Sequence, residues 1–361
     1  MKLQHSFLNM MNKSKSTKPI AVWLLTGVGM LIVQILLGGI TRLSGSGLSI
    51  TEWNVVTGTI PPLNEHQWLI EFEKYRQTPQ FKLINSNFSL HNFQSIYFWE
   101  WFHRLWAKLM GVVFLIPFIV FLFQKRFTLK IFQLLFGLFL LGALQGSVGW
   151  IMVKSGLTGD AIYVQPVKLA IHFLLAMVLL CYTFYMALYL LVSREQKVFH
   201  PAAKKISIAI ILIVLVQFFF GALMAGYKAA LAAPTWPDIN GAFLPAQIVG
   251  SDVSVLKNML AIQFIHRTIA YIIFILVVVK FLYEYRLQNN RIFNYVKWTS
   301  YCLVVLQICL GIFTVLSSIK IVPNVWGVFE TLALTHQIIG MLFLLSMIFC
   351  FYLLQTKKLY S

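Results

Sequence analysis

The chain has 361 residues, of which 59% are hydrophobic and only 11% are charged, and its mean hydropathy is +0.78. A composition this apolar excludes an ordinary water-soluble protein and is typical of a chain that crosses a membrane several times. The net charge is +18. We attribute this charge to membrane orientation and to affinity for anionic membrane lipid, and we expect no nucleic acid partner.

Apolar stretches long enough to cross a hydrocarbon core of roughly 30 Å predict eight transmembrane helices, and therefore an all-α polytopic membrane protein. These stretches cover residues 20–41, 97–123, 129–153, 165–192, 206–227, 258–282, 298–318 and 330–354. The first stretch follows basic residues, as the apolar part of a signal peptide would. Because it has spanning length and no small-residue cleavage site follows it, we interpret it as the first helix.

The positions of lysine and arginine predict that both chain ends lie on the cytoplasmic side of a cell inner membrane, because positively charged loops are retained there. With this orientation, 17 of the 29 Lys and Arg residues lie in inner segments, although the outer loops are longer. The two longest outer loops, 42–96 and 227–257, are expected to cover the outer end of the helices. The aromatic and acidic stretch 68–75 in the first of them predicts a short helix on the membrane surface.

Four histidines lie near the predicted outer ends of alternate helices and form two equally spaced pairs. His266 follows His103 by 163 residues, and His336 follows His172 by 164. A neutral imidazole is costly to bury in hydrocarbon without a partner, whereas two imidazoles from neighbouring helices can hold haem iron from both faces. We therefore predict one iron site at His103 and His172 and another at His266 and His336. The alternative is that each histidine only forms a hydrogen bond with a neighbouring helix.

The odd-numbered predicted helices share a Q-x-x-x-G element, which supports an internal duplication. Its four copies are Gln34–Gly38, Gln145–Gly149, Gln217–Gly221 and Gln307–Gly311. The spacing places a polar group and a gap on one helix face, where another helix or a flat macrocycle can approach closely. We predict two four-helix bundles, 1–192 and 206–361, which are related by a pseudo-twofold axis and joined by a cytoplasmic linker, 193–205.

The two copies differ at one position beside the first histidine of each pair. Glu100 precedes His103 by three residues, whereas Gln263 occupies the matching place before His266. The carboxylate shares a helix face with the imidazole, so it is either paired with Arg104 or handles protons in the same pocket. Glutamine cannot transfer a proton. The difference predicts chemistry in the first half, with Glu100 as the catalytic residue, and a permanently bound haem in the second.

Haem carries anionic propionate groups, which must be neutralised or reach water. Cations near the predicted outer edge of the two sites are therefore candidates to bind them. The candidates are Arg42, Arg104, Lys154, Lys228 and Arg267.

The sequence resembles the haem A synthase family, in the branch found in mitochondria and many Gram-negative bacteria, over nearly its whole length. The first outer loop lacks the cysteine pair that some family members have, so a mechanism that uses this pair is excluded. The matching stretches are GGITRLSGSGLSITEW (38–53), PPLNEHQW (61–68), EFEKYRQTPQF (71–81), EWFHRLW (100–106), LQGSVGWIMVKSGL (144–157), PTWPDINGAFLP (234–245), IQFIHRTIAY (262–271) and LTHQIIG (334–340).

The resemblance implies oxidation of the C8 methyl group of haem O to a formyl group, which gives haem A for a terminal oxidase. By analogy with the family, His103 and His172 would bind the substrate haem, and Glu100 would be required for the reaction. His266 and His336 would be the axial ligands of haem b. We expect two successive hydroxylations, after which the geminal diol loses water.

The implied partners are haem O, an external electron donor that the sequence does not identify, haem O synthase as a supplier of substrate, and a second copy of the chain. Two other functions compete with this interpretation. A bis-histidine dihaem cytochrome that only transfers electrons would need no Glu100. A transporter that binds a metal ion through the histidines would require clustered carboxylates or thiolates, which the sequence lacks.

Overall fold

The computed structural model describes residues 17–52, 57–249, 253–285, 287 and 290–355. Within these residues it contains eight helices long and apolar enough to cross a membrane, as the sequence predicts. They are α2 (Lys18–Leu43), α5 (Leu90–Phe123), α6 (Leu129–Lys154), α7 (Pro166–Leu191), α8 (Pro201–Tyr227), α10 (Met259–Glu284), α11 (Arg291–Ser317) and α12 (Val328–Leu353). The protein is therefore an all-α, multi-pass membrane protein.

Three of the helices begin earlier than hydropathy predicts. α5 begins at residue 90 rather than 97, α8 at 201 rather than 206, and α11 at 291 rather than 298. In each case a polar side chain caps the first turn: Ser89, His200 and Asn290 each accept a hydrogen bond from a backbone N–H. Pro201 belongs to the first turn of α8, where proline is well tolerated, and not to a linker.

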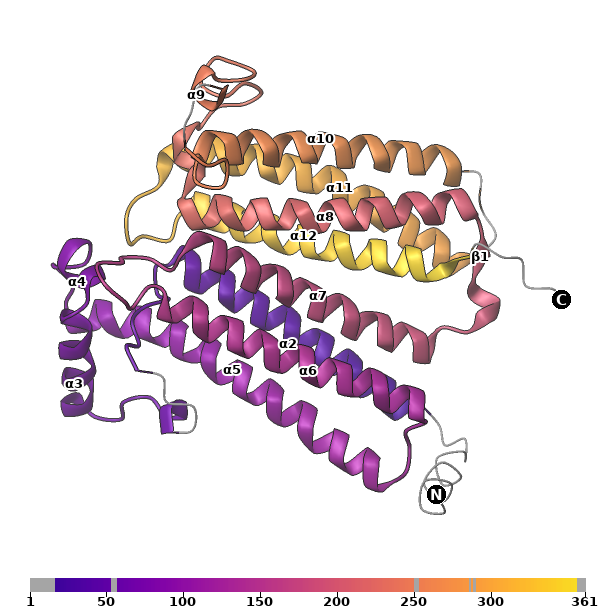
Figure 1. The fold of residues 1–361 in the computed structure, drawn as a ribbon, viewed down its shortest axis with the longest axis horizontal. Coiled ribbons are helices and arrows are strands. Elements are labelled where there is room, and N and C mark those ends of the chain that lie inside the picture. The colour runs from indigo at the N-terminus through magenta and orange to yellow at the C-terminus, as the bar shows by residue number, and fades with distance from the viewer. Residues whose placement is uncertain (1–16, 53–56, 250–252, 286, 288–289, 356–361) are drawn as a thin grey trace.

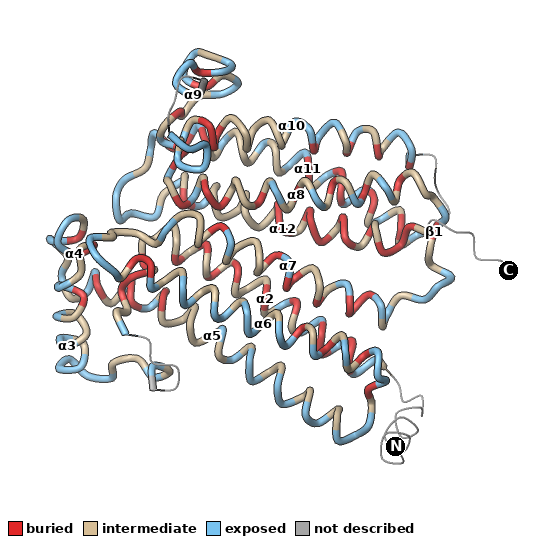
Figure 2. Tube along the Cα trace, in the orientation of Figure 1, coloured by how far each residue is buried: buried red, intermediate tan, exposed pale blue. Residues whose placement is uncertain are grey.

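The helices form two groups of four that lie side by side (Figure 1). We call α2, α5, α6 and α7 the first half, and α8, α10, α11 and α12 the second half. At the centre, α7 packs against α8 and α12, and α2 packs against α12. Buried residues gather along these central helices (Figure 2), whereas α5 is buried only near its start. The pseudo-twofold relation between the halves stays a prediction.

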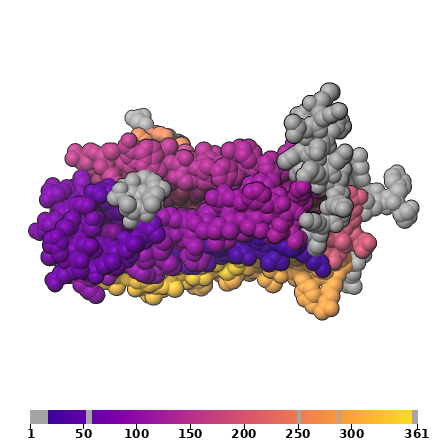
Figure 3. Space-filling view, turned by 90° about the horizontal axis from the view of Figure 1, so that it is seen from below, coloured from indigo at the N-terminus to yellow at the C-terminus, as the bar shows by residue number. Residues whose placement is uncertain are grey.

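The loops at one end of the bundle contain most of the shorter elements. After α2 the chain forms the 3-10 turn η1 (Thr57–Thr59), α3 (Glu65–Arg76) and α4 (Pro79–Leu83), so the helix predicted at 68–75 is confirmed. These residues form the indigo end of the elongated molecule in Figure 3. Burial raises the pKa of the Tyr75 hydroxyl to about 12, so this group stays protonated and donates to Gln80 at 3.1 Å. We call this end, where α2 ends and α5 begins, the histidine end.

The second half has further short elements. A 3-10 turn, η3 (Ala229–Ala232), and α9 (Ala246–Val249) lie between α8 and α10, and η4 (Ser318–Lys320) follows α11. At the opposite end of the bundle, η2 (Arg194–Gln196) precedes β1 (Val198–Phe199), which pairs in parallel with β2 (Leu354–Gln355). This short pairing holds the connection between the two halves against the end of α12.

The opposite end of the second half also contains a buried ionic cluster. Lys280 Nζ lies 2.7 Å from Glu284 Oε2, and both side chains are fully buried. The Tyr301 hydroxyl donates to the same carboxylate oxygen at 2.7 Å. Lys297 donates to the backbone carbonyls of Glu284 and Leu287, each at 3.0 Å. Lys297 therefore satisfies carbonyls at the end of α10 that have no partner within the helix.

Candidate functional site

Each of the four predicted histidines lies against the Q-x-x-x-G element of the preceding membrane helix. The distance from the glutamine amide nitrogen to histidine Nε2 is 3.2 Å for Gln34 and His103, 3.5 Å for Gln145 and His172, 3.3 Å for Gln217 and His266, and 3.2 Å for Gln307 and His336. An amide nitrogen only donates, so Nε2 accepts through its lone pair. The same lone pair is the one that binds a metal ion, so a bound metal would take the place of the glutamine contact.

The glycine of each element provides the space that the imidazole occupies. A Cβ atom at this position would lie close to Cε1 of the paired histidine: at 3.2 Å for Gly38, 2.7 Å for Gly149, 3.2 Å for Gly221 and 3.0 Å for Gly311. Such distances are shorter than ordinary van der Waals contact between carbon atoms. The gap inferred from the sequence therefore admits the imidazole of the next helix, which the glutamine and glycine hold in place.

The histidines of the second half lie at a separation that suits one shared metal ion. The ring centres of His266 and His336 are 6.4 Å apart, and the ring planes are inclined by 66°. A metal-to-imidazole bond is about 2 Å long, so two rings that share a metal ion have centres about 6 Å apart. His336 Nδ1 lies 3.1 Å from the backbone oxygen of Gln307, so Nε2 is the atom that would bind a metal ion, in place of its contact with the Gln307 amide.

Several polar atoms around the histidines are buried and have no hydrogen-bond partner among the described residues. They are Oε1 of the four glutamines and Nδ1 of His103, His172 and His266. A buried polar atom without a partner is uncommon in a folded protein and indicates a missing water, ion or ligand. Together with the glycine gaps, these atoms fit a group bound between the imidazoles of each half.

A single cavity of about 2180 Å³ reaches all four histidines. Its lining is mainly apolar, with Glu100 and several cations at the histidine end. A pocket for one small ligand usually has a volume of about 300–1,000 Å³, so this cavity has room for more than one large ligand. The structure thus brings the four predicted residues together around one shared space.

Glu100 is 3% exposed, and both of its carboxylate oxygens have partners. Oε1 lies 2.6 Å from Arg104 Nη2, so the pairing that the sequence left open as one of two alternatives is present. Oε2 accepts hydrogen bonds from the Ser49 hydroxyl and backbone N–H, both at 2.7 Å, and from the Ile50 N–H at 3.0 Å. The first loop therefore surrounds this carboxylate with donors, which suits an ionised group.

Gln263 has a partner like that of Glu100 at one atom of its side-chain amide and a different kind of partner at the other. Its Oε1 accepts from Arg267 at 2.6 Å, as Glu100 does from Arg104. Its Nε2, however, donates to the backbone carbonyl of Ala229 at 2.6 Å. The loop after α2 offers N–H donors to the carboxylate of Glu100. The loop after α8 offers a carbonyl acceptor to the NH₂ group of Gln263.

Two of the propionate candidates are bound to loops beside the cavity. Arg104 donates to the backbone oxygens of Ile50 and Glu52, each at 3.2 Å. Arg267 donates to the backbone oxygens of Asp238 at 2.8 Å and Ala233 at 3.3 Å. Each arginine therefore fastens a loop over the cavity and also lines it.

Arg42 and Lys228 lie at the seam between the halves. Arg42 Nη2 donates to the backbone oxygens of Ala225 at 2.6 Å and Gly226 at 3.0 Å, across the seam at the end of α8. Lys228 donates to the hydroxyl of Tyr163 at 2.8 Å, and all three side chains line the cavity. Lys154, in contrast, is exposed, lies 5.2 Å from the centre of the Trp150 ring, and is not among the described residues that line the cavity.

Sequence reasoning missed the partners that hold Glu100 and join the halves. Ser49 and Ile50 belong to a short serine- and glycine-rich run after α2, which could have been read as a source of free backbone N–H groups. Tyr163 carries no such signal. Gln337 follows a predicted ligand directly, and its amide donates to the Ile35 backbone oxygen at 3.0 Å.

The fold and the site together define a polytopic helical membrane protein with a doubled histidine site around one apolar cavity. The model of the COX15-CtaA family, described as cytochrome oxidase assembly protein, matches residues 21–348. The chain belongs to this family.

Its relatives have the same name in several organisms. Heme A synthase of Rhodospirillum centenum is 41% identical over 310 residues, which cover 84% of this chain and 82% of that protein. Heme A synthase of Cereibacter sphaeroides is 37% identical over 337 residues, covering 88% and 83%. Heme A synthase of Bradyrhizobium diazoefficiens is 35% identical over 354 residues, covering 96% and 93%. The family resemblance inferred from the motifs is confirmed.

Proposed function

We propose that this protein is a haem A synthase, an oxidoreductase that converts the C8 methyl group of haem O to a formyl group and so supplies haem A for cytochrome oxidase. The observation that carries the proposal is the pairing of two histidine sites around one cavity, in a chain whose relatives are heme A synthases. Glu100 stands beside the first histidine of one site, and Gln263 occupies the matching place in the other. The two histidine sites are alike but have different neighbouring residues. This suits a substrate in one site and a resident cofactor in the other.

The first half, residues 1–192, would hold the substrate. His103 and His172 would bind the iron of haem O from its two faces, with Gln34 and Gln145 orienting the rings. The second half, residues 206–361, would hold a resident haem b between His266 and His336. When bound, that haem supplies one-electron transfer between an external donor and the substrate site.

Glu100 would handle protons in the substrate site. The carboxylate lines the cavity, and Arg104 with the Ser49 and Ile50 N–H groups keeps it in one position. An ionised carboxylate there can accept a proton released as the methyl carbon is oxidised, or stabilise positive charge that develops beside it. Gln263 can do neither, which fits a second half that only carries electrons.

The cations at the histidine end would bind the propionates. Arg42 and Lys228 are favoured over Lys154 because they line the cavity near the seam. Arg104 and Arg267 would contribute from the loop side of each site. Positive charge at one end of an apolar cavity orients an amphiphilic macrocycle, with its carboxylates toward the histidine end and its apolar edge toward the middle of the membrane.

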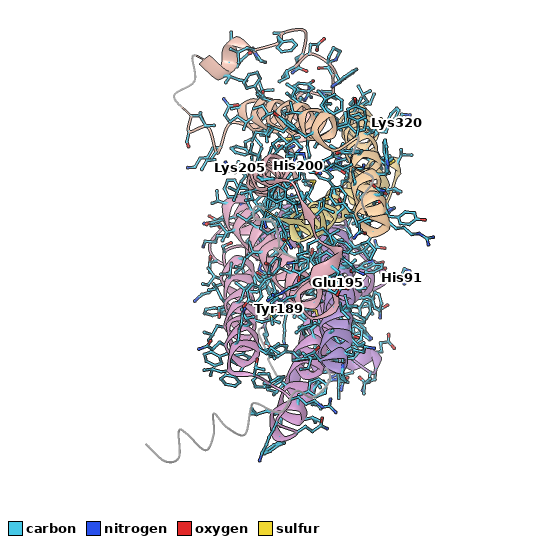
Figure 4. All side chains as sticks on the ribbon, turned by 90° about the vertical axis from the view of Figure 1, so that its right-hand side faces the viewer. His91, Tyr189, Glu195, His200, Lys205 and Lys320 are labelled. Atoms are coloured by element: carbon cyan, nitrogen blue, oxygen red, sulfur yellow. The ribbon has the colours of Figure 1, made fainter. Side chains whose placement is uncertain are left out.

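We place the protein in a cell inner membrane with both chain ends in the cytoplasm, so that the histidine end faces the other side. At the end away from the histidines, lysines lie over aromatic rings: Lys130 over Tyr189, Lys197 over Tyr352 and Lys204 over Phe351. Figure 4 looks onto this end and labels Tyr189. Such contacts also occur at the histidine end, for Lys154 and Lys228, so the excess of lysine and arginine in the inner segments is what supports the cytoplasmic assignment.

Pigment extraction tests the proposal. Membranes that contain the wild-type chain and a source of haem O should yield a formyl haem, identified by its reduced pyridine spectrum and its mass. His103→Ala should yield none but should keep the haem of the second half. A purely electron-transferring cytochrome would keep two haems and form no haem A, and that result with the wild type would refute the proposed activity.

A further inference from the structure

The two halves differ in the membrane helices that flank their cavities. The backbones of α10 and α11 in the second half make only slight contact, and those of α5 and α6 in the first half make at most marginal contact. Toward the end away from the histidines, aromatic side chains fill the space between α5 and α6, with ring centres 6.3 Å apart for Phe114 and Phe139 and 6.1 Å apart for Phe118 and Phe132. The part nearer the histidines is not filled in this way.

Small residues line this unfilled part, and the cavity reaches them. We call it the α5–α6 opening, formed by Ala107 and Gly111 of α5 and by Gly142, Ala143 and Gly146 of α6. A Cβ atom added at Gly111, Gly142 or Gly146 would meet nothing within 4 Å. Gly111, Ala143 and Gly146 are exposed at the surface of the bundle. The opening therefore connects the cavity with the lateral surface of a membrane-spanning bundle, where lipid lies.

The opening is continuous with the first histidine site. Ala107 follows His103 by one helical turn on the same face of α5, and Gly142 precedes Gly149 by two turns on the same face of α6. Gly149 is the residue that lies against His172. The unpartnered Nδ1 atoms of His103 and His172 and the Oε1 of Gln145 lie beside this same space and mark it as a ligand site.

The second half has bulky residues at the matching positions. When Gln145 is aligned with Gln307, Gly142 corresponds to Val304 and Gly146 to Ile308. When His103 is aligned with His266, Gly111 corresponds to Phe274. Val304 and Ile308 also line the cavity, but their branched side chains occupy space that the glycines leave free, and Phe274 does not line it. The same helix pair therefore has less free space in the half that we assign to the resident haem.

We infer that the α5–α6 opening is the lateral entrance through which the substrate haem passes from the membrane, and that it holds the long isoprenoid substituent of haem O while the macrocycle lies between His103 and His172. This inference rests on the proposed function. Haem O is insoluble in water, its carboxylates suit the cations at the histidine end, and its apolar tail then points toward the middle of the membrane. A resident haem needs no such entrance, and the second half has the bulkier Val304 and Ile308 where the first has glycines.

Filling the opening with the residues of the second half tests this inference. In the double variant Gly142→Val with Gly146→Ile, the added Cβ atoms have nothing within 4 Å, so the variant is expected to fold. Purified variant in lipid nanodiscs is mixed with haem O, and association is followed by absorbance. We expect the association rate constant and the affinity to fall roughly tenfold or more, because added methyl groups overfill the site. The association rate constant of protohaem should also fall, because the macrocycle uses the same entrance, but its affinity should change much less, because it lacks the isoprenoid tail.

The matched control is Ser147→Ile, which adds a similar side chain on the exposed face of α6 outside the cavity lining. It should bind haem O as the wild type does, and all variants should retain the haem of the second half. If the double variant takes up haem O at the wild-type rate, or loses affinity for haem O and protohaem equally, the inference is wrong. A wild type that binds haem O but forms no haem A would instead contradict the proposed activity.

Discussion

The two halves have the same scaffold but differ in what surrounds it. In each half a glutamine and a glycine of one helix hold a histidine of the next, and an arginine directly after the first histidine fastens a loop. Beside this shared frame, Glu100 faces backbone N–H groups, whereas Gln263 faces a carbonyl. The frame therefore suits any macrocycle that binds between imidazoles, and a few residues around it decide whether a half reacts or only holds its ligand.

The halves also differ in how firmly they are closed. The first half has an opening lined by glycines, and the second half has valine, isoleucine and phenylalanine at the matching places. The buried cluster of Lys280, Glu284 and Tyr301 belongs to the second half, where it joins α10 to α11. A closed, internally bonded half suits a ligand that stays, and an open half suits a ligand that is exchanged.

The largest expected effect comes from replacing Glu100 by glutamine, which removes this difference between the two halves. In Glu100→Gln the new NH₂ group must face either Arg104 or the N–H groups of Ser49 and Ile50, so donors meet donors in both orientations. We expect the rate of haem A formation to fall roughly 10²–10⁴-fold, the usual contribution of a proton-transfer group. The initial rate is measured by pigment extraction, together with the affinity for haem O.

A loss of rate with retained affinity for haem O supports a role for Glu100 in the reaction. If rate and affinity fall together, the carboxylate mainly holds the loop. An undiminished rate of haem A formation would show that our role for Glu100 is wrong.

The second prediction concerns the closed half. Lys280→Met leaves the Glu284 carboxylate buried without its cation, which should lower the free energy of unfolding by about 3–5 kcal/mol. Replacing both residues, Lys280→Met with Glu284→Leu, removes the unpaired charge and should recover most of this loss. Unfolding of the purified protein in detergent measures both effects. Equal stability of Lys280→Met and the wild type would contradict a role of this pair in closing the half.

The smallest expected effect distinguishes two glycines within the first half. A Cβ at Gly149 lies 2.7 Å from His172, and one at Gly38 lies 3.2 Å from His103. Gly149→Ala must therefore displace its histidine further, and should lower the affinity for haem O by roughly tenfold, more than Gly38→Ala does. Spectral titration with haem O compares the two variants, and equal affinities would show that the rings shift freely.

Much of this architecture follows from local chemistry. A helix in hydrocarbon must satisfy its own backbone, so long apolar runs predicted the eight spans. The four histidines could be predicted as site residues because a polar ring within an apolar helix needs a partner. The contacts of Glu100 with Ser49 were not predictable, since they join segments separated by a long loop. Likewise the spacing of Lys280 and Glu284 is visible in the sequence, but their burial depends on how α11 covers them.

The contacts across the seam have a consequence for motion. Many doubled membrane proteins rock one repeat against the other to expose a central site first to one side and then to the other. Here Arg42 of α2 is bound to carbonyls at the end of α8, and Gln337 of α12 is bound to α2. Rocking would break these charge-assisted and buried bonds. The two halves are therefore expected to stay together as one rigid block during the reaction. Alternating access is then not the way in which a ligand reaches the interior of the protein.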